Sequence, residues 1–389
     1  MVTAAEGVRF STAAALLLLC LNAPIDAAPA LQDHPFPKRN QLPLNLLFLD
    51  QTPRSALLLA PRAIRLSLFI SHESTLVGDH DLHTLFADDD FATLGGLVSE
   101  TILANVAAAG GTSYFIDGET TRMVLEGTFG IGPRVEIGAD IPLLLHSAGR
   151  FDAAIDRYHE RFGFADGGRP NFVRYRFVGG YVGDGESVFV DGSPGGVGLG
   201  DIVLGARTAL LEARGRRPAL SAGLSLKLPT GDAGRLEGSG HSDYGLGLQL
   251  SEWIGRSTIH CGYSYTFSGG WALAPGLPMV DLRSLFAAYA FNWTPRRVLI
   301  AQVLRSSGAF PYRAGGDLGT TATEMSIGMR HLLARGYSLE WGLIENLSPD
   351  QNTTDVGLFF GLSFKKPGGG TGSRTGSLRW PGTDPTNRY

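Results

Sequence analysis

Apolar and polar residues alternate along most of the chain after residue 62. In the stretch "ALSAGLSLKLPTGD", at 219–232, apolar side chains occupy every second position from Leu220 to Leu228, and Ser, Gly and Lys lie between them. A period of two is typical of a β-strand with two unlike faces. Such runs follow one another at 62–75, 112–130, 133–146, 198–212, 218–230, 243–254, 258–268, 279–293, 297–308, 320–333, 337–347 and 354–364.

The connections between these runs are of two kinds, which alternate in order. One kind is short and often basic, at 130–134, 212–218, 254–257, 294–297 and 334–336. The other kind is longer and polar, at 76–111, 147–197, 231–242, 268–279, 309–319 and 348–353. Short turns on one side and long loops on the other are typical of outer-membrane barrels, whose even strand number places both ends on the short-turn side. The sequence therefore predicts an all-β fold, a 12-stranded antiparallel transmembrane barrel over 62–364 with short periplasmic turns, long extracellular loops and one loop helix.

The two faces of these runs indicate which side meets lipid. A soluble sandwich would not usually leave Gly, Ser and charged residues opposite the apolar face of nearly every strand, whereas a barrel with a polar lumen does so. Because both signs of charge face the lumen, we favour a salt-bridge network that braces the wall over an ion-selective ring of one sign. A polar track for a small solute is the alternative. The predicted lumen-lining charges are Arg122, Glu126, Glu136, Asp140, Asp201, Arg207, Lys227, Glu324, Arg330 and Glu340.

Charge and cysteine content narrow the class of protein further. The formal net charge is −4 with no block of like charge, so no nucleic-acid partner is expected. The apolar run "FSTAAALLLLCLNAP" is too short to span a membrane and precedes a small-x-small pattern, which predicts a signal peptide at 1–30. Only Cys261 then remains, so no internal disulfide is expected. We expect the barrel in the outer membrane of a Gram-negative-type cell, in contact with its lipid.

Two segments flank the predicted barrel. Residues 31–61 form a periplasmic N-terminal segment, which either threads into the lumen as a partial plug or lies along the barrel foot. The last strand ends in the aromatic Phe364, which resembles the insertion signal of outer-membrane barrels and implies the barrel-assembly machinery as a partner. Residues 365–389 are rich in Gly, Ser and Pro and are predicted to be a disordered periplasmic tail.

The longest loop, 147–197, contains a candidate gate. Phe151, Ile155, Tyr158 and Phe162 recur at the spacing of one face of an amphipathic helix over 151–164. A twelve-strand lumen is narrow enough for one helix to occlude it. Our hypothesis is a lid that docks its aromatic face on the barrel mouth and gates an apolar ligand. The alternative is a helix that packs on neighbouring loops.

Two His-Ser stretches suggest catalysis but have the wrong geometry. They are His146-Ser147 and His241-Ser242-Asp243. Adjacent residues of a strand point to opposite faces, so neither pair can share one side of a continuous strand. No metal-ligand spacing and no phosphate loop occur. The sequence therefore predicts no catalytic residues, no metal, no cofactor and no enzyme.

Several stretches resemble known families. "GLGDIVLGARTALL", "LSAGLSLKLPTGD" and "GSGHSDYGLGLQLS" are similar to the barrel family named for a putative MetA pathway of phenol degradation. With "RNQLPLNLLF" and "DGETTRMVLEGTFGIGPRVEIGADIPLLLHSAGRFDAAIDRYHERFGFADGGR", the chain more closely resembles an uncharacterised family, domain of unknown function number 3187. The resemblance spans roughly residues 37–364 and implies an outer-membrane barrel, without an activity or site residues.

These observations together predict a channel or facilitator. Its solute is small, and the aromatic loop helix favours an apolar one. A sealed structural barrel and a lipid-active barrel hydrolase are the alternatives.

Overall fold

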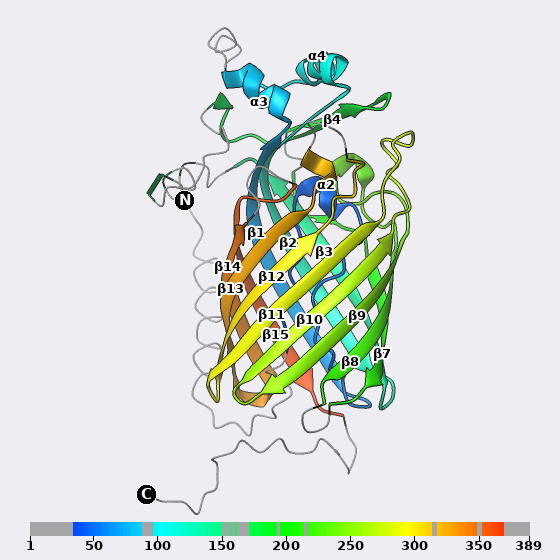
Figure 1. Ribbon diagram of the computed structural model, residues 1–389, viewed down its shortest axis with the longest axis vertical. Helices are drawn as coiled ribbons and strands as arrows, with labels where there is room; N and C mark the ends of the chain where they lie inside the picture. The colour runs from blue at the N-terminus through cyan, green and yellow to red at the C-terminus, as the bar shows by residue number, and fades with distance from the viewer. Residues whose placement is uncertain are drawn as a thin grey trace, which may run out of the picture.

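Twelve antiparallel strands close into a barrel in the computed structural model (Figure 1). The structure describes residues 34–87, 96–149, 171–192, 195–213, 217–312, 317–347 and 352–368, together with positions 153, 157, 160 and 161. The barrel strands are β1 (Ile64–Gly78), β2 (Thr112–Gly130), β3 (Val135–Ser147), β7 (Val203–Leu211), β8 (Ala219–Lys227), β9 (Asp243–Ile254), β10 (Ser257–Phe267), β11 (Leu282–Thr294), β12 (Arg297–Ser306), β13 (Ala322–Leu332), β14 (Tyr337–Asn346) and β15 (Val356–Lys366).

Each barrel strand pairs with its neighbours in chain order. Closure comes from the first and last strands, where Ile64 lies opposite Lys366 and Ser74 opposite Val356. A closed barrel leaves no unpaired strand edge, which a lipid environment requires. The predicted fold class, a 12-stranded antiparallel barrel of the outer-membrane type, is therefore confirmed.

The outer and inner faces differ as the alternation predicts. On β8 the outward Leu224 is 61% exposed, whereas the inward Ser221 and Lys227 are 0% and 2% exposed. Exposed apolar side chains recur around the outer wall, among them Leu125, Leu204, Leu246, Tyr263, Leu285, Tyr289, Ile327, Leu343 and Leu358. Such a large exposed apolar surface is stable in lipid but not in water.

The long-loop end carries an extension that the sequence placed in loops. β1 and β2 continue past the barrel, and the start of β2 pairs with β4 (Val178–Gly183), which pairs with β5 (Glu186–Asp191). The helices α3 (His80–Ala87) and α4 (Glu100–Gly110) lie over this extension (Figure 1). They bury an apolar cluster of Leu76, Leu82, Phe86, Val98, Leu103, Phe115, Phe172 and Val178. The predicted loops at 76–111 and 147–197 thus contain packed structure in their described parts.

The opposite end consists of short turns, and β1 begins and β15 ends there (Figure 1). A short strand, β6 (Gly198–Leu199), leads into β7 and pairs with β3. None of the described helices is long and apolar enough to cross a membrane. The predicted signal peptide at 1–30 lies outside the described residues, as does the tail beyond residue 368.

Candidate functional site

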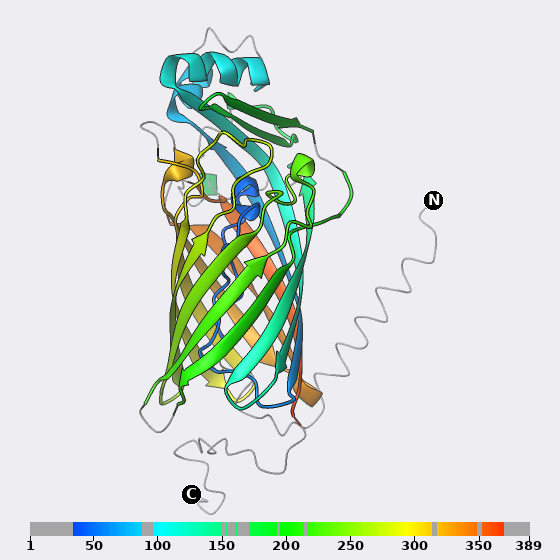
Figure 2. The ribbon, with the colours of Figure 1, turned by 90° about the vertical axis from the view of Figure 1, so that its right-hand side faces the viewer.

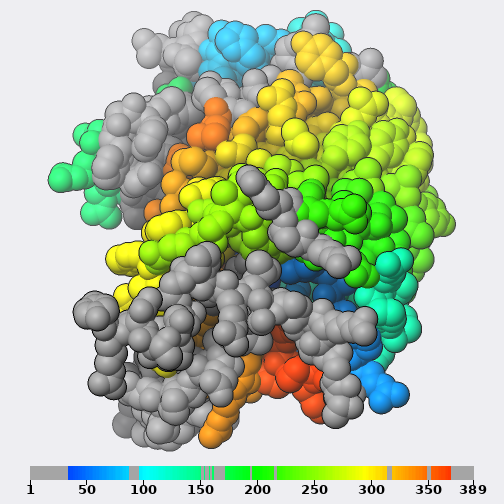
Figure 3. All heavy atoms as spheres, turned by 60° about the horizontal axis from the view of Figure 1, so that its bottom comes forward, coloured from blue at the N-terminus to red at the C-terminus, as the bar shows by residue number. Residues whose placement is uncertain are grey.

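The lumen is occupied by the N-terminal segment of the described chain. Residues 34–59, here called the plug, run inside the barrel towards the long-loop end, turn at α2 (Pro43–Leu46) and run back (Figure 2). Seen from the short-turn end, blue N-terminal atoms lie between the red of β15 and the green strands (Figure 3). The sequence left open whether residues 31–61 thread into the lumen or lie along the barrel foot. From His34 onward, the segment threads into the lumen.

The ascending limb of the plug, 34–42, is anchored to the inner wall by charges and an aromatic contact. Lys38 lies 2.8 Å from Glu73 and 3.4 Å from Glu324, and all three side chains are almost fully buried. Phe36 packs against Phe359 with ring centroids 4.5 Å apart. A Cβ added at Gly328 would lie 2.9 Å from the Phe36 ring, so the glycine leaves the space that this ring fills.

The apex of the plug closes the long-loop end with apolar side chains. Pro43 lies at the start of α2. Proline is well tolerated there, because the N–H that it lacks would make no hydrogen bond within the helix. The apex residues Leu42, Leu44, Leu47 and Phe48 are at most 1% exposed. They share one buried cluster with residues of the extension and the long loops, among them Ile116, Phe177, Tyr181, Leu236, Trp271, Leu277 and Phe310. Burial of these apolar groups is the main force that holds the apex in the mouth.

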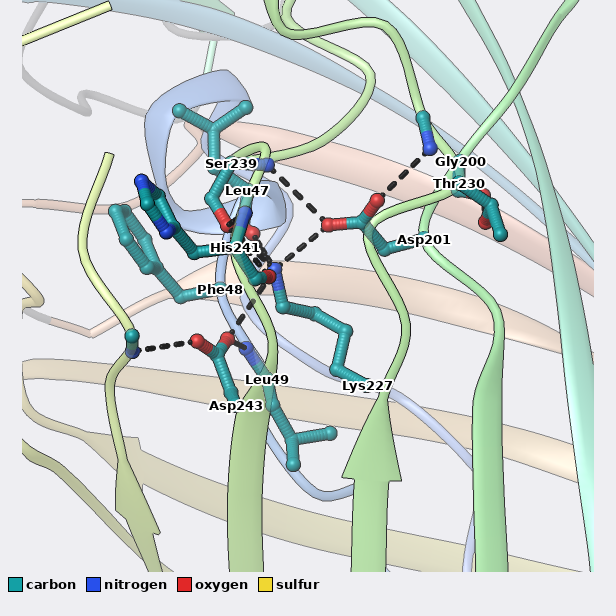
Figure 4. A network of polar contacts seen from close by, with 12 residues as sticks. Leu47, Phe48, Leu49, Gly200, Asp201, Lys227, Thr230, Ser239, His241 and Asp243 are labelled. Atoms are coloured by element: carbon teal, nitrogen blue, oxygen red, sulfur yellow. Dashed lines mark hydrogen bonds and ion pairs between the residues drawn. The ribbon is translucent and has the colours of Figure 1, made fainter. Parts of the chain in front are cut away.

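A buried lysine joins the apex to the barrel and to a long loop (Figure 4). Lys227 Nζ donates to the carbonyl of Leu47 at 2.7 Å and to Ser239 Oγ at 2.7 Å. It also lies 2.6 Å from Asp201 and 3.3 Å from Asp243. We call this set the Lys227 cluster. A buried ammonium with this many acceptors is fully satisfied, and it fixes the plug at the carbonyl of residue 47.

The descending limb, 47–59, runs back from the long-loop end and is anchored by a second set of charges. Arg54 lies 2.6 Å from Glu126 and 3.0 Å from Asp140, and we call these three residues the Arg54 cluster. Burial alone would lower the pKa of Arg54, but Glu126 and Asp140 raise it above its ordinary value, so the guanidinium stays charged. Further down, the amide of Leu59 donates to Glu136 at 2.7 Å. The plug is therefore held along its whole length by side chains of the wall.

All but one of the ten predicted lumen-lining charges lie on barrel strands, the exception being Asp201 in the connection between β6 and β7, and nine of the ten form ion pairs. The described pairs are Arg54 with Glu126 and Asp140, Arg207 with Glu136, Lys227 with Asp201, Lys38 with Glu324, and Arg330 with Glu340. The exception is Arg122, which makes no ion pair with any described residue. Three of these pairs use a plug residue, so the wall charges anchor the plug as well as one another.

Sequence reasoning found the wall charges but not their partners in the plug. These partners, Lys38 and Arg54, lie in a proline-interrupted stretch without strand periodicity, which gives no direction to their side chains. Charged residues in a segment that precedes the first strand were one available sign of a plug. Glycines of the inner wall were another. A Cβ at Gly245 would lie 2.5 Å from the Gln51 amide, so this glycine also makes room for the plug.

The predicted loop-helix gate stays a prediction. Phe151, Ile155, Tyr158 and Phe162 lie outside the described residues. In the part of the lumen that the structure describes, the plug runs along the inside of the barrel (Figure 2).

In the first of the two His-Ser stretches, the histidine is held by structural contacts. His146 contacts Thr120 Oγ1 at 3.0 Å and the carbonyl of Leu236 at 3.1 Å, so both ring nitrogens have structural partners. The structure instead brings Ser251 Oγ to 2.8 Å from His260 Nδ1, a pair that the sequence did not suggest. Both residues are 0% exposed and lie beneath the plug, where Ser251 also accepts from the amide of Ala56. With the plug in place this pair is buried, and Ser251 holds the plug through the amide of Ala56.

Comparisons with known proteins place the chain in a family. The family described as "Protein of unknown function (DUF3187)" matches residues 96–366, which confirms the resemblance found in the sequence. No curated protein matches the chain.

Solved structures also resemble the barrel. The chain is similar to the COG4313 outer membrane channel from Pseudomonas putida F1, with 11% identity over 82% of this chain and 100% of that one and a TM-score of 0.49. It is similar to the NanC porin, with 8% identity, 63% and 93% coverage and a TM-score of 0.37. It is also similar to a TodX deltaS2S3 mutant monoaromatic hydrocarbon channel, with 12% identity, 79% and 91% coverage and a TM-score of 0.37. Because the family match extends over more than half of its residues, this protein belongs to the family described as Protein of unknown function (DUF3187).

Proposed function

We propose that the protein is an outer-membrane channel for a small solute and that the plug closes it at rest. The observation that carries the proposal is the way in which the lumen is filled. Residues 34–59 contribute no strand to the barrel wall, which is complete without them. A segment of this kind can leave the lumen without breaking the hydrogen bonds that close the barrel, so the closed state can convert to an open one.

The lining favours a polar solute over the apolar one that the loop helix suggested. Ionised and hydroxyl side chains cover the inner wall, including Arg122, Glu126, Asp140 and Ser221. Once the plug has left, these groups regain water, and an apolar molecule would gain little from contact with them. A lid formed by the helix 151–164 remains a second proposal, because such a lid would lie outside the plug and act in series with it.

Single-channel conductance in a planar bilayer tests both gates. We expect the wild type to be closed for most of the time, and deletion of 34–59 to give discrete, larger and longer-lived steps. Deletion of 150–165 reports on the loop helix separately: steps that enlarge in this variant alone would make that helix the gate. A folded plug deletion, recognised by heat-modifiable mobility, that never conducts would contradict the channel and support the sealed structural barrel.

A reversible crosslink provides the matched control. Ser55 Oγ in the plug lies 3.4 Å from Ser251 Oγ on β9, so cysteines at these two positions are well placed to form a disulfide. We expect Ser55→Cys with Ser251→Cys, in a Cys261→Ser background, to be silent when oxidised and to conduct after reduction. Equal conductance in both redox states would show that the plug does not gate the lumen.

A further inference from the structure

One buried arginine of the inner wall has no partner in the part of the chain that the structure describes. Arg122 lies on β2, and its side chain is only 7% exposed. Among the described residues it makes no hydrogen bond and no ion pair. The contrast with Arg330 on β13 is sharp, because that guanidinium is held by Glu340 at 2.6 Å and by the carbonyl of His34 at 2.7 Å.

Arg122 lines a cavity of about 60 Å³ between the descending limb of the plug and the wall. The charged residues around this cavity are four arginines and three carboxylates, namely Arg39, Arg54, Arg122, Arg207, Asp50, Glu136 and Asp140. The balance therefore favours positive charge, and two of the arginines come from the plug itself.

Each of the three carboxylates is already engaged elsewhere. Asp140 accepts from Arg54 at 3.0 Å, and Glu136 accepts from Arg207 at 2.9 Å. Asp50 accepts from the hydroxyls of Ser284 and Ser306 on the opposite wall. Asp140, Glu73 and Asp50 attract Arg122 from a distance, Arg39 repels it, and none of them forms an ion pair with it.

We propose that this cavity binds a small carboxylate anion on the guanidinium of Arg122. A buried charge is normally paired or bound to a ligand, because removing it from water without a partner is costly. The planar fork of a guanidinium matches the two oxygens of a carboxylate and binds it in bidentate fashion. Arg39, whose guanidinium lines the same cavity, adds positive potential without a free carboxylate to cancel it.

The size of the cavity limits the anion. About 10–15 Å³ of such space suffices for one water molecule, so the cavity has room for about four groups of that size. Formate and acetate fit this limit, whereas a sugar acid does not. The site exists with the plug in place, so it does not depend on whether the barrel conducts.

Binding of ¹³C-acetate to the refolded full-length protein, followed by NMR in a chloride-free buffer, tests the site. We expect saturable binding at one site in the wild type. Arg122→Gln should weaken it about tenfold or more, because a charge-assisted bidentate contact is lost. Arg134→Gln, which changes an exposed arginine on a turn, should leave the binding unchanged.

Stability distinguishes a ligand site from a structural role. Because Arg122 has no partner among the residues that the structure describes, Arg122→Gln should unfold in urea at the same or a higher concentration than the wild type when acetate is absent. Added acetate should stabilise the wild type and not the variant. Absence of saturable acetate binding in the folded wild type would overturn the proposal, as would equal binding in Arg122→Gln. Saturation by chloride but not by acetate would overturn the carboxylate assignment.

Discussion

The Lys227 cluster and the Arg54 cluster both hold the plug in the lumen, but they differ in their access to water. The Lys227 and Asp243 side chains are 2% and 0% exposed, whereas Arg54 is 23% and Asp140 is 16% exposed. The first cluster lies under the apolar apex and includes residues of a long loop, and the second borders the cavity of the descending limb. We therefore expect the long-loop end of the plug to be held more firmly than the descending limb.

The largest effect is expected from Lys227→Met, which keeps the size of the side chain but removes its charge. Asp201 and Asp243 would then be buried without a counter-charge, although backbone amides still donate to both. Breaking a buried pair in this way costs about 3–5 kcal/mol. We expect the apex to detach, so that the plug becomes sensitive to protease added from the long-loop side. If the plug of the variant resists protease as well as that of the wild type, the apolar apex alone fixes the long-loop end of the plug.

A smaller effect is expected from Arg54→Gln. Glu126 and Asp140 lose their cation, but both side chains are partly exposed and can be hydrated, so we expect a loss of about 1–3 kcal/mol. Hydrogen exchange should increase in residues 50–59 and not at the apex. The double variant Arg54→Gln with Asp140→Asn should recover part of the loss, because one uncompensated charge is removed with its partner. Equal exchange at both ends of the plug would remove the difference between the clusters.

The smallest effect is expected from Arg134→Gln, which breaks an ion pair outside the lumen. Arg134 and Glu212 lie 2.9 Å apart with side chains 67% and 61% exposed. Exposed pairs contribute about 0–1 kcal/mol. We expect a change in urea unfolding of the barrel at the limit of detection and no change in the exposure of the plug. If Arg134→Gln lowered the stability as much as Arg54→Gln does, the burial of an ion pair would not determine how much it contributes to stability.

Much of the wall could be predicted from the sequence, because its physical cause is local. A strand between lipid and a polar lumen must alternate, so Leu224 and Lys227 show their faces in the sequence alone. Short and long connections alternate because successive antiparallel strands run in opposite directions, so that their connections lie at opposite ends of the barrel in turn. The inward direction of charges such as Glu136 and Arg330 also follows from this period.

The plug could not be predicted in the same way. Residues 34–59 have neither strand nor helix periodicity over any length, so their placement depends on contacts with residues more than two hundred positions away, such as Lys38 with Glu324 and Phe36 with Gln302. The extension at the long-loop end has a similar cause, since α3 and α4 are stabilised by a cluster to which Phe172 contributes from another loop.

By itself, the sequence determined that this chain forms a twelve-stranded barrel, which of its faces meets lipid, and which charges point inward. Only the tertiary structure decided that the N-terminal segment lies inside the lumen, which charges pair, and that Arg122 borders a cavity without a partner among the described residues. The physical reason is that the direction of a side chain follows from the two-residue period of a strand. The neutralisation of its charge depends on which distant residue the closed barrel brings next to it.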